Sequence, residues 1–217
     1  MNNKKRSILI WIVLLIVVGG AVFAMIKFGG STPSGTSSEL ADLTLPTDRI
    51  LGNKDAKVSI VEYSDYQCPA CAAYYPLIKQ LMQDFNDQIK LVYRDFPLSQ
   101  HSNAKPAAYA AEAAGIQGKY WEMHDLIFAN QQVWESRTDA QMVFNEFAGQ
   151  LGLDLNKFKA DVGSQAVKDK VQQDYDSGTR SKITGTPTIF INGSKMQPIS
   201  SYGELKNNVQ QAINQNH

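Results

Sequence analysis

Cysteine and histidine are scarce in this chain, with two and three copies among 217 residues. So few cysteines exclude a small scaffold held together by many disulfides, and they exclude a zinc module with four cysteine ligands. Glycine and proline number 15 and 8, which is ordinary. A collagen-like or broadly disordered chain is therefore not expected, and the length suits one globular domain with a sizeable core.

The chain also lacks an excess of either charge, since 21 Lys and Arg face 21 Asp and Glu. Four of the bases, Lys4, Lys5, Arg6 and Lys27, lie in the first 30 residues, which contain no acid. The rest holds 21 − 4 = 17 bases against 21 acids. A body with this acidic balance and no basic stripe argues against nucleic acid as a partner.

The N-terminus carries a long apolar run, because the 19 residues 8–26 contain no charge. As a helix they would extend roughly 28 Å, about the thickness of the hydrocarbon layer. The preceding basic cluster predicts a cytoplasmic tail over 1–7, a single-pass transmembrane signal anchor over 8–28, and a body on the extracytoplasmic side of the cell membrane. A buried core helix and cleavage after Ala24 are the alternatives. Residues 29–38 are rich in Gly, Ser and Thr and predict a flexible linker.

The first part of the body, residues 39–217, predicts alternating strands and helices. Residues 57–64 and 89–94 are rich in β-branched and aromatic side chains, as strands are. A helix is expected from Cys68-Pro69 to about Phe85, with a kink at Pro76. Residues 101–182 then show helical periodicity, including a capping box formed by Thr138 and Gln141.

The last part of the body returns to strand character at 187–191, and Asn192-Gly193 is a strong hairpin signal. Ser201 and Glu204 form a second capping box, which predicts a final helix. The order is strand, helix, strand, helical block, strand, hairpin strand, helix. This order predicts an α/β layer with a helical insertion over about 101–182.

Both cysteines lie in one motif, Cys68-Pro69-Ala70-Cys71, between a predicted strand and a predicted helix. This spacing lets the two sulfurs bond, and the helix start places the first sulfur over free N–H groups that favour a thiolate. Cys68 is therefore the expected attacking and attackable sulfur, and Cys71 the resolving one.

The motif has two other interpretations. Zinc would need further ligands, and the histidines available are His101, His124 and His217. His101 is expected in a loop and His124 packed on a helix face, so no metal site is predicted. An inert structural disulfide is the second alternative, although so short a loop constrains the unfolded chain weakly.

Two more features agree with redox chemistry. Glu62 lies on the predicted buried strand, where a raised pKa would let it take and return the Cys71 proton. A position facing outward at the strand end, or an ion pair, is the alternative for Glu62. Thr186-Pro187 opens the late strand, and a cis bond facing the sulfurs would leave the Thr186 backbone free to pair with a substrate strand.

Five segments together resemble the DsbA-like branch of the thioredoxin superfamily over about residues 50–213. They are 61–71 (VEYSDYQCPAC), 93–98 (YRDFPL), 111–115 (AEAAG), 120–124 (YWEMH) and 185–193 (GTPTIFING). The resemblance implies a thioredoxin fold with an inserted all-helical subdomain, Cys68 and Cys71 as the redox-active pair, Pro187 as the cis proline beside them, and Glu62 as the buried carboxylate.

The expected function is a membrane-anchored thiol–disulfide oxidoreductase that forms disulfide bonds in exported proteins. Reduced exported proteins would be its substrates, and no cofactor is expected beyond the sulfur pair. The resemblance also implies reoxidation by a quinone-linked membrane protein. A reductase or isomerase on the same fold is one alternative, and a tethered peptide-binding or holdase domain with an inert disulfide is another.

Overall fold

The computed structural model describes residues 39–199 and 201–215. The predicted tail 1–7, anchor 8–28 and linker 29–38 lie outside these residues. In the described part, no helix has both the length and the apolar character needed to cross a bilayer. The first described residue, Glu39, joins the fold through an isolated bridge to Ser194.

A mixed five-stranded sheet forms the centre of the described residues, in the order β1-β3-β2-β4-β5. The central strands β2 and β3 are parallel, and the other neighbours are antiparallel. β2 is buried at every position except Ser59, as predicted for a strand covered on both faces. The strands are β1 (Arg49–Gly52), β2 (Val58–Ser64), β3 (Ile89–Asp95), β4 (Thr188–Ile191) and β5 (Ser194–Lys195).

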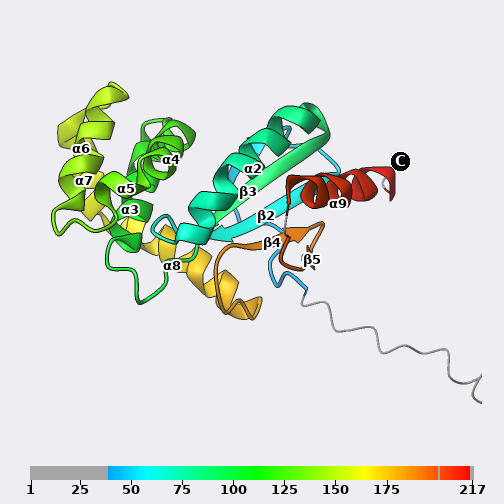
Figure 1. Cartoon of the computed structure of the whole chain (residues 1–217). Coiled ribbons are helices and arrows are strands. Elements are labelled where there is room, and N and C mark those ends of the chain that lie inside the picture. The colour runs from blue at the N-terminus through cyan, green and yellow to red at the C-terminus, as the bar shows by residue number, and fades with distance from the viewer. Residues whose placement is uncertain (1–38, 200, 216–217) are drawn as a thin grey trace, which may run out of the picture. The chain divides into compact units, whose positions relative to one another are not determined.

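Helices cover both faces of this sheet (Figure 1). On one face α2 (Pro69–Phe85) and α9 (Tyr202–Gln215) bury apolar side chains against Ile60 of β2. On the other, α8 (Gln165–Arg180) packs so tightly that a Cβ on Gly178 would lie 2.5 Å from the Phe96 ring. Because side chains alternate along a strand, Glu62 shares the α2 face with Ile60, and Tyr63 points toward α8.

The helical block predicted over 101–182 lies between β3 and β4 in the chain and gathers beside one end of the sheet (Figure 1). Its core is alanine-rich on α3, which lets neighbouring helices approach closely. Before α8 the block contains α3 (Ala104–Ile116), α4 (Tyr120–Ala129), α5 (Gln131–Trp134), α6 (Ala140–Gln150) and α7 (Leu155–Gly163).

Two predicted turn and cap signals are confirmed. Asn192 and Gly193 join β4 to β5 with φ angles of 49° and 85°, the left-handed values that this hairpin turn requires. The Ser201 hydroxyl accepts a hydrogen bond from the Glu204 N–H at 3.3 Å, where α9 begins. Both signals depend on residues that are neighbours along the chain.

Other local predictions were wrong or incomplete. The capping box at Thr138 does not form: α6 begins after Asp139, and no side chain caps it. β1 and α7 were not predicted, and α7 is capped by the Asp154 carboxylate.

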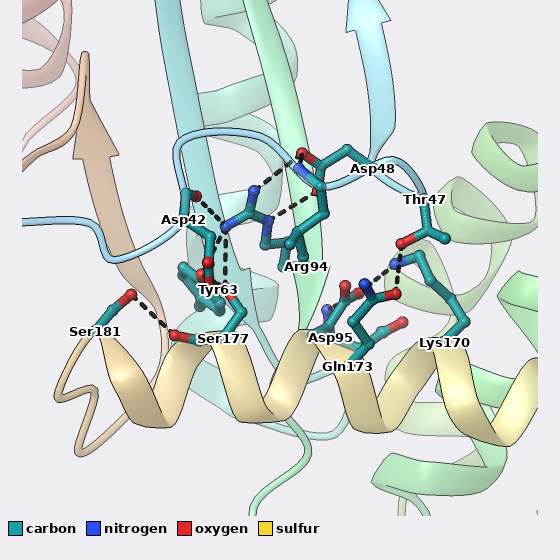
Figure 2. Close-up of polar contacts among 12 residues, drawn as sticks. Asp42, Thr47, Asp48, Tyr63, Arg94, Asp95, Lys170, Gln173, Ser177 and Ser181 are labelled. Carbon is teal, nitrogen blue, oxygen red and sulfur yellow. Dashed lines mark hydrogen bonds and ion pairs between the residues drawn. The ribbon is translucent and has the colours of Figure 1, made fainter.

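A buried charge network fastens the segment before β1 to the sheet and to α8 (Figure 2). The Arg94 guanidinium donates to both carboxylate oxygens of Asp48, at 2.8 and 2.9 Å, and to the Tyr63 hydroxyl at 2.7 Å. The Arg94 and Asp48 side chains are 0% and 3% exposed. The Tyr63 hydroxyl in turn lies 2.5 Å from the Ser177 hydroxyl of α8. This network joins β2 and β3 to α8 on the face of the sheet opposite Glu62.

Candidate active site

The two cysteines lie at the start of α2, as the sequence predicts. Cys68 is the residue that caps the helix, with an extended backbone, and Pro69 is the first helical residue. Proline suits this position because the first turn has no partner for an N–H group. Cys68 is 8% exposed and Cys71 is fully buried, and both are free thiols. Only Cys68 can therefore be reached directly by another thiol.

The loop that carries Cys68 is held by residues of the helical block. The Asp65 carboxylate accepts hydrogen bonds from the Leu98 N–H at 2.9 Å and from His101 Nδ1 at 2.7 Å. The Gln131 amide donates to the carbonyl oxygens of Tyr66 and Cys68, at 2.7 and 3.1 Å. Sequence reasoning missed Asp65 and Gln131 and left His101 in a loop. The acid directly after a buried strand was the one available signal.

The electrostatics of the two sulfurs are opposite. The pKa of Cys68 is lowered from 9.0 to about 5, chiefly by a hydrogen bond from the Cys71 thiol. Burial opposes this shift, whereas the Thr186 side chain and the backbone N–H groups of Cys71 and Ala70 add to it. Burial, and then the charge of Cys68, raise the pKa of Cys71. At neutral pH the site therefore holds a Cys68 thiolate beside a protonated Cys71.

The helix start and the second cysteine both favour the Cys68 thiolate. The sequence pointed to the helix start as the source of stabilisation. The N–H groups of Cys71 and Ala70 do contribute, and the hydrogen bond from the Cys71 thiol adds a contribution larger than either of theirs. The second cysteine thus has an electrostatic effect as well as a place in the disulfide.

Thr186 and Pro187 come from the far end of the chain and lie beside the sulfurs. The Thr186–Pro187 bond is cis, and the Thr186 carbonyl oxygen lies 3.5 Å from Cys68 Sγ. The turn before β4 is closed by a hydrogen bond from the Thr188 hydroxyl to the Gly185 carbonyl at 2.8 Å. The sequence analysis made substrate pairing conditional on a cis Thr186–Pro187 bond beside the sulfurs, and the structure has this arrangement.

Glu62 is buried in the middle of β2, with an exposure of 3%. It pairs in register with Tyr93 of β3 and Ile189 of β4, and the ion pairs of the described residues do not include it. Burial raises its pKa from 4.5 to about 7, against a smaller opposing effect of a Ser64 hydrogen bond. Besides burial, the charges of Glu62 and Cys71 both raise the pKa of Tyr93, so the three side chains lie close together. Glu62 can thus bind or release a proton near physiological pH.

A cavity of about 400 Å³ has Glu62 in its lining. Its walls are α2 and α4, with parts of the sheet between them. It is lined by Leu51, Gly52, Glu62, Tyr75, Ile78, Lys79, Met82, Gln83, Asn86, Leu91, Trp121, His124, Asp125 and Phe128. The cavity gives the Glu62 carboxyl a route to solvent on the side away from Cys68.

The cysteines are not part of any cluster with metal-ligand geometry in the described residues. The one cluster found there is Asp95, Glu112 and Asp174, with ligand oxygens within 4.8 Å of one another. Two cations already face these oxygens, because Lys170 pairs with Asp174 and Arg49 pairs with Glu112. Burial, then the charges of Glu112 and Asp174, raise the pKa of Asp95 well above its usual value. With Asp95 protonated, the negative charges of Glu112 and Asp174 are balanced by the positive charges of Arg49 and Lys170.

A model of the thioredoxin family matches residues 44–211, well over half of the chain. The chain belongs to the thioredoxin family. The membership of the thioredoxin superfamily that the sequence motifs imply is therefore confirmed.

Three solved structures illustrate the thioredoxin-family fold. A thioredoxin-like oxidoreductase from Silicibacter pomeroyi is 25% identical, with a TM-score of 0.67 over 83% of this chain and 99% of its own. Alpha-DsbA1 from Wolbachia pipientis is 21% identical, with a TM-score of 0.72 over 83% of this chain and 97% of its own. BdbD from Bacillus subtilis is 23% identical, with a TM-score of 0.69 over 77% of this chain and 93% of its own.

Curated relatives of this chain are named as Na⁺/H⁺ antiporters and not as thioredoxins. A Na⁺/H⁺ antiporter NhaA 3 from Salinispora tropica is 36% identical over 166 residues, and an NhaA 1 from Salinispora arenicola is 38% identical over the same length. Each match covers 74% of this chain but 24% of the relative. The chain thus spans about a quarter of the curated relatives it matches, so their name carries no conclusion about its chemistry.

Proposed function

We propose that this protein is a thiol–disulfide oxidoreductase that forms disulfide bonds in exported proteins through Cys68 and Cys71. The observation that carries the proposal is the inequality of the two sulfurs. The accessible one has a pKa of about 5, and the buried one has a raised pKa. A low pKa makes Cys68 a good leaving group, and it stabilises the reduced protein relative to the disulfide.

The reaction begins with the Cys68–Cys71 disulfide. A substrate thiolate attacks Cys68 Sγ, the bond to Cys71 breaks, and Cys71 leaves with the electron pair and takes a proton from Glu62. A second substrate thiolate then attacks the substrate sulfur of the mixed disulfide and releases Cys68 as a thiolate. The substrate loses two electrons to form its disulfide, and the protein gains them as two reduced sulfurs.

Glu62 supplies the proton for this exchange and accepts it again in the reverse direction. A pKa of about 7 leaves a comparable share of protonated and ionised carboxyl near neutral pH. Buried Cys71 needs such a group because bulk water does not reach its sulfur directly. Thr186 has a different role: its backbone, held by Pro187 next to Cys68, pairs with an extended substrate segment.

The proposed setting of the reaction is the outer face of the cell membrane. The apolar run 8–28 would anchor the protein, with 1–7 in the cytoplasm and 29–38 linking the anchor to the head at 39–217. Reduced exported proteins are the proposed substrates, and a quinone-linked membrane protein the proposed oxidant that restores the disulfide. Labelling of Cys68 in intact cells by a membrane-impermeant maleimide would support this location; labelling only after lysis would contradict it.

Redox equilibrium tests the direction of exchange. The full chain in mild detergent is equilibrated with graded glutathione buffers, and the fraction of reduced Cys68 is counted by thiol labelling. A midpoint above about −180 mV supports an oxidant, and one near about −270 mV indicates a reductase instead.

Trapping tests the roles of the two cysteines. Cys71→Ser should accumulate mixed disulfides with reduced substrate proteins, and Cys68→Ser should form none. If neither variant traps substrate and Cys68 labels slowly at pH 6, the holdase alternative with an inert sulfur pair is favoured.

A further inference from the structure

His124 of α4 lines the same cavity as Glu62, although the two residues are far apart in the chain. The ring of Tyr93, which pairs in register with Glu62, lies 4.8 Å from the His124 ring, centroid to centroid. Glu62 and His124 therefore line one cavity, from the sheet side and from the helical side. Sequence analysis assigned His124 to packing alone.

The surroundings of His124 keep the ring uncharged and fix its orientation. Aromatic rings surround it, with centroids between 4.8 and 6.3 Å away: Tyr66, Tyr75, Tyr93, Tyr120, Trp121 and Phe128. Burial lowers the pKa of His124, against the opposing effect of Asp125. His124 is 6% exposed, so it touches the cavity while remaining part of the core.

Asp125 connects His124 to the protein surface. His124 Nδ1 lies 3.4 Å from Asp125 Oδ1, and Lys79 Nζ lies 2.6 Å from the other carboxylate oxygen. Burial alone would raise the pKa of Asp125, but the hydrogen bonds from His124 and Lys79 bring it to about 2. An ionised Asp125 only accepts hydrogen bonds, so Nδ1 carries the ring proton and Nε2 is left as an acceptor.

The proposed function requires such a route. Each exchange moves a proton onto or off Glu62, whose carboxyl is buried and has no ion-pair partner among the described residues. Turnover stops unless that proton is exchanged with solvent. The cavity that Glu62 lines offers that proton a way out.

We propose that His124 relays protons between the Glu62 carboxyl and solvent through the cavity between α2 and α4. The inference rests on the proposed function and adds a residue to it. His124 acts through Glu62 and does not touch the reacting sulfurs. It is therefore a positioning residue and not a catalytic residue.

The relay conserves protons at each step. When Cys71 gives its proton to the Glu62 carboxylate, the resulting acid passes a proton through cavity water to His124 Nε2. The ring becomes an imidazolium, stabilised by the adjacent Asp125 carboxylate, and then releases one proton to water at the cavity mouth. His124 returns to its neutral form and Glu62 to its carboxylate; in the oxidising direction the same steps run in reverse.

The titratable groups that face His124 come from each element packed against it. Tyr66 precedes α2, and Tyr75 and Lys79 lie on α2; Glu62 and Tyr93 lie on the sheet; Tyr120 and Asp125 lie on α4. Burial raises the pKa of each of these tyrosines above its usual value. Between pH 5 and 9 the tyrosines therefore keep their protons, and Glu62 and His124 are the groups that can exchange one.

Chemical rescue tests the relay. Stopped-flow exchange between the oxidised full chain and a reduced peptide is measured for the wild type and His124→Ala, from pH 5 to 9. We expect about a tenfold or greater loss of rate in the variant, with an unchanged midpoint in glutathione buffer. Added imidazole should occupy the vacated space and restore most of the rate.

Two further variants separate the relay from a packing effect. Met82→Ala enlarges the same cavity without removing a proton carrier, so imidazole should leave its rate unchanged. His124→Asn keeps a polar side chain beside Asp125 without a titratable nitrogen, so it should be as slow as His124→Ala. It also provides the test if the alanine variant does not fold.

Two results would overturn the proposal. One is a His124 variant that exchanges at the wild-type rate throughout the pH range. The other is a slow variant that imidazole does not rescue and that Met82→Ala matches in rate. If the wild type itself shows no exchange, the proposed function fails together with the relay; an active wild type with an unaffected variant removes the relay alone.

Discussion

Two buried polar regions lie on opposite faces of the sheet, and they treat charge in opposite ways. Beneath α8, Arg94 pairs with Asp48 (Figure 2), and Lys170 pairs with Asp174 of the same helix. On the α2 face, Glu62 has no cation beside it among the described residues, and Cys68 is stabilised by a thiol and by backbone N–H groups.

The difference separates charges that hold the fold from charges that take part in chemistry. A carboxylate paired with an arginine keeps its charge over the physiological pH range and is a poor proton carrier. A buried carboxyl without a cation, such as Glu62, shifts its pKa toward neutrality and can exchange a proton. The same burial thus gives a rigid brace on one face and a titratable site on the other.

Removing a cation from the paired face should have the largest effect. Arg94→Ala leaves the buried Asp48 carboxylate without its partner, so we expect a loss of about 3–5 kcal/mol in the free energy of unfolding. Denaturant titration measures it. Arg137→Ala, which breaks an exposed pair with Asp139, is the control and should show no measurable change. Equal effects of the two variants would contradict the stabilising role assigned to the Arg94–Asp48 pair.

Neutralising the unpaired acid should act in the opposite direction. The folded pKa of Glu62 is about 7 against an ordinary 4.5, so the folded state binds more protons between these values and loses stability as pH rises through them. Glu62→Gln removes this penalty. The variant should be about 3 kcal/mol more stable than the wild type at pH 8 and equal to it at pH 4. A pH-independent difference would contradict the raised pKa.

Cys68 should show the reverse pH dependence in the reduced protein. Its folded pKa is about 5 against an ordinary 9.0, so the unfolded chain binds more protons between these values and stability rises with pH. At pH 7 the gain over pH 4 should be about 2–3 kcal/mol. Thermal or denaturant unfolding of the reduced wild type and of reduced Cys68→Ser measures it, since the serine variant lacks this gain. Parallel pH curves for the two proteins would mean that Cys68 ionises like an ordinary thiol.

A cap far from the sulfurs should give the smallest effect. The Asp154 carboxylate accepts hydrogen bonds from the N–H groups of Asn156 and Lys157 at the start of α7. Asp154→Ala should reduce the free energy of unfolding by about 1 kcal/mol. Its redox midpoint should remain at the wild-type value, because α7 packs chiefly against α3, α6 and α8. A shifted midpoint would show that the helical block tunes the sulfurs.

Some elements could not be predicted for physical reasons. β1 has only four residues and is held by backbone pairing with β3, which requires no particular side-chain pattern. The capping box at Thr138 satisfied the pattern, but Asp139 became the residue before α6, one position later. Asp65, His101 and Gln131 give no signal as a group, because they meet only when the helical block packs against the loop before α2.

The sequence by itself determined the features that depend on neighbours along the chain. The strand before Cys68, the helix after Cys68, the turn at Asn192-Gly193 and the cap at Ser201 arise from local hydrogen bonding and periodicity. Only the tertiary structure placed Thr186 beside Cys68 and opened one cavity to both Glu62 and His124. Both placements come from packing between segments that are distant in the chain. The pKa shifts of Glu62 and Cys71 depend on desolvation by those same segments, and such burial exists only once the layers have packed.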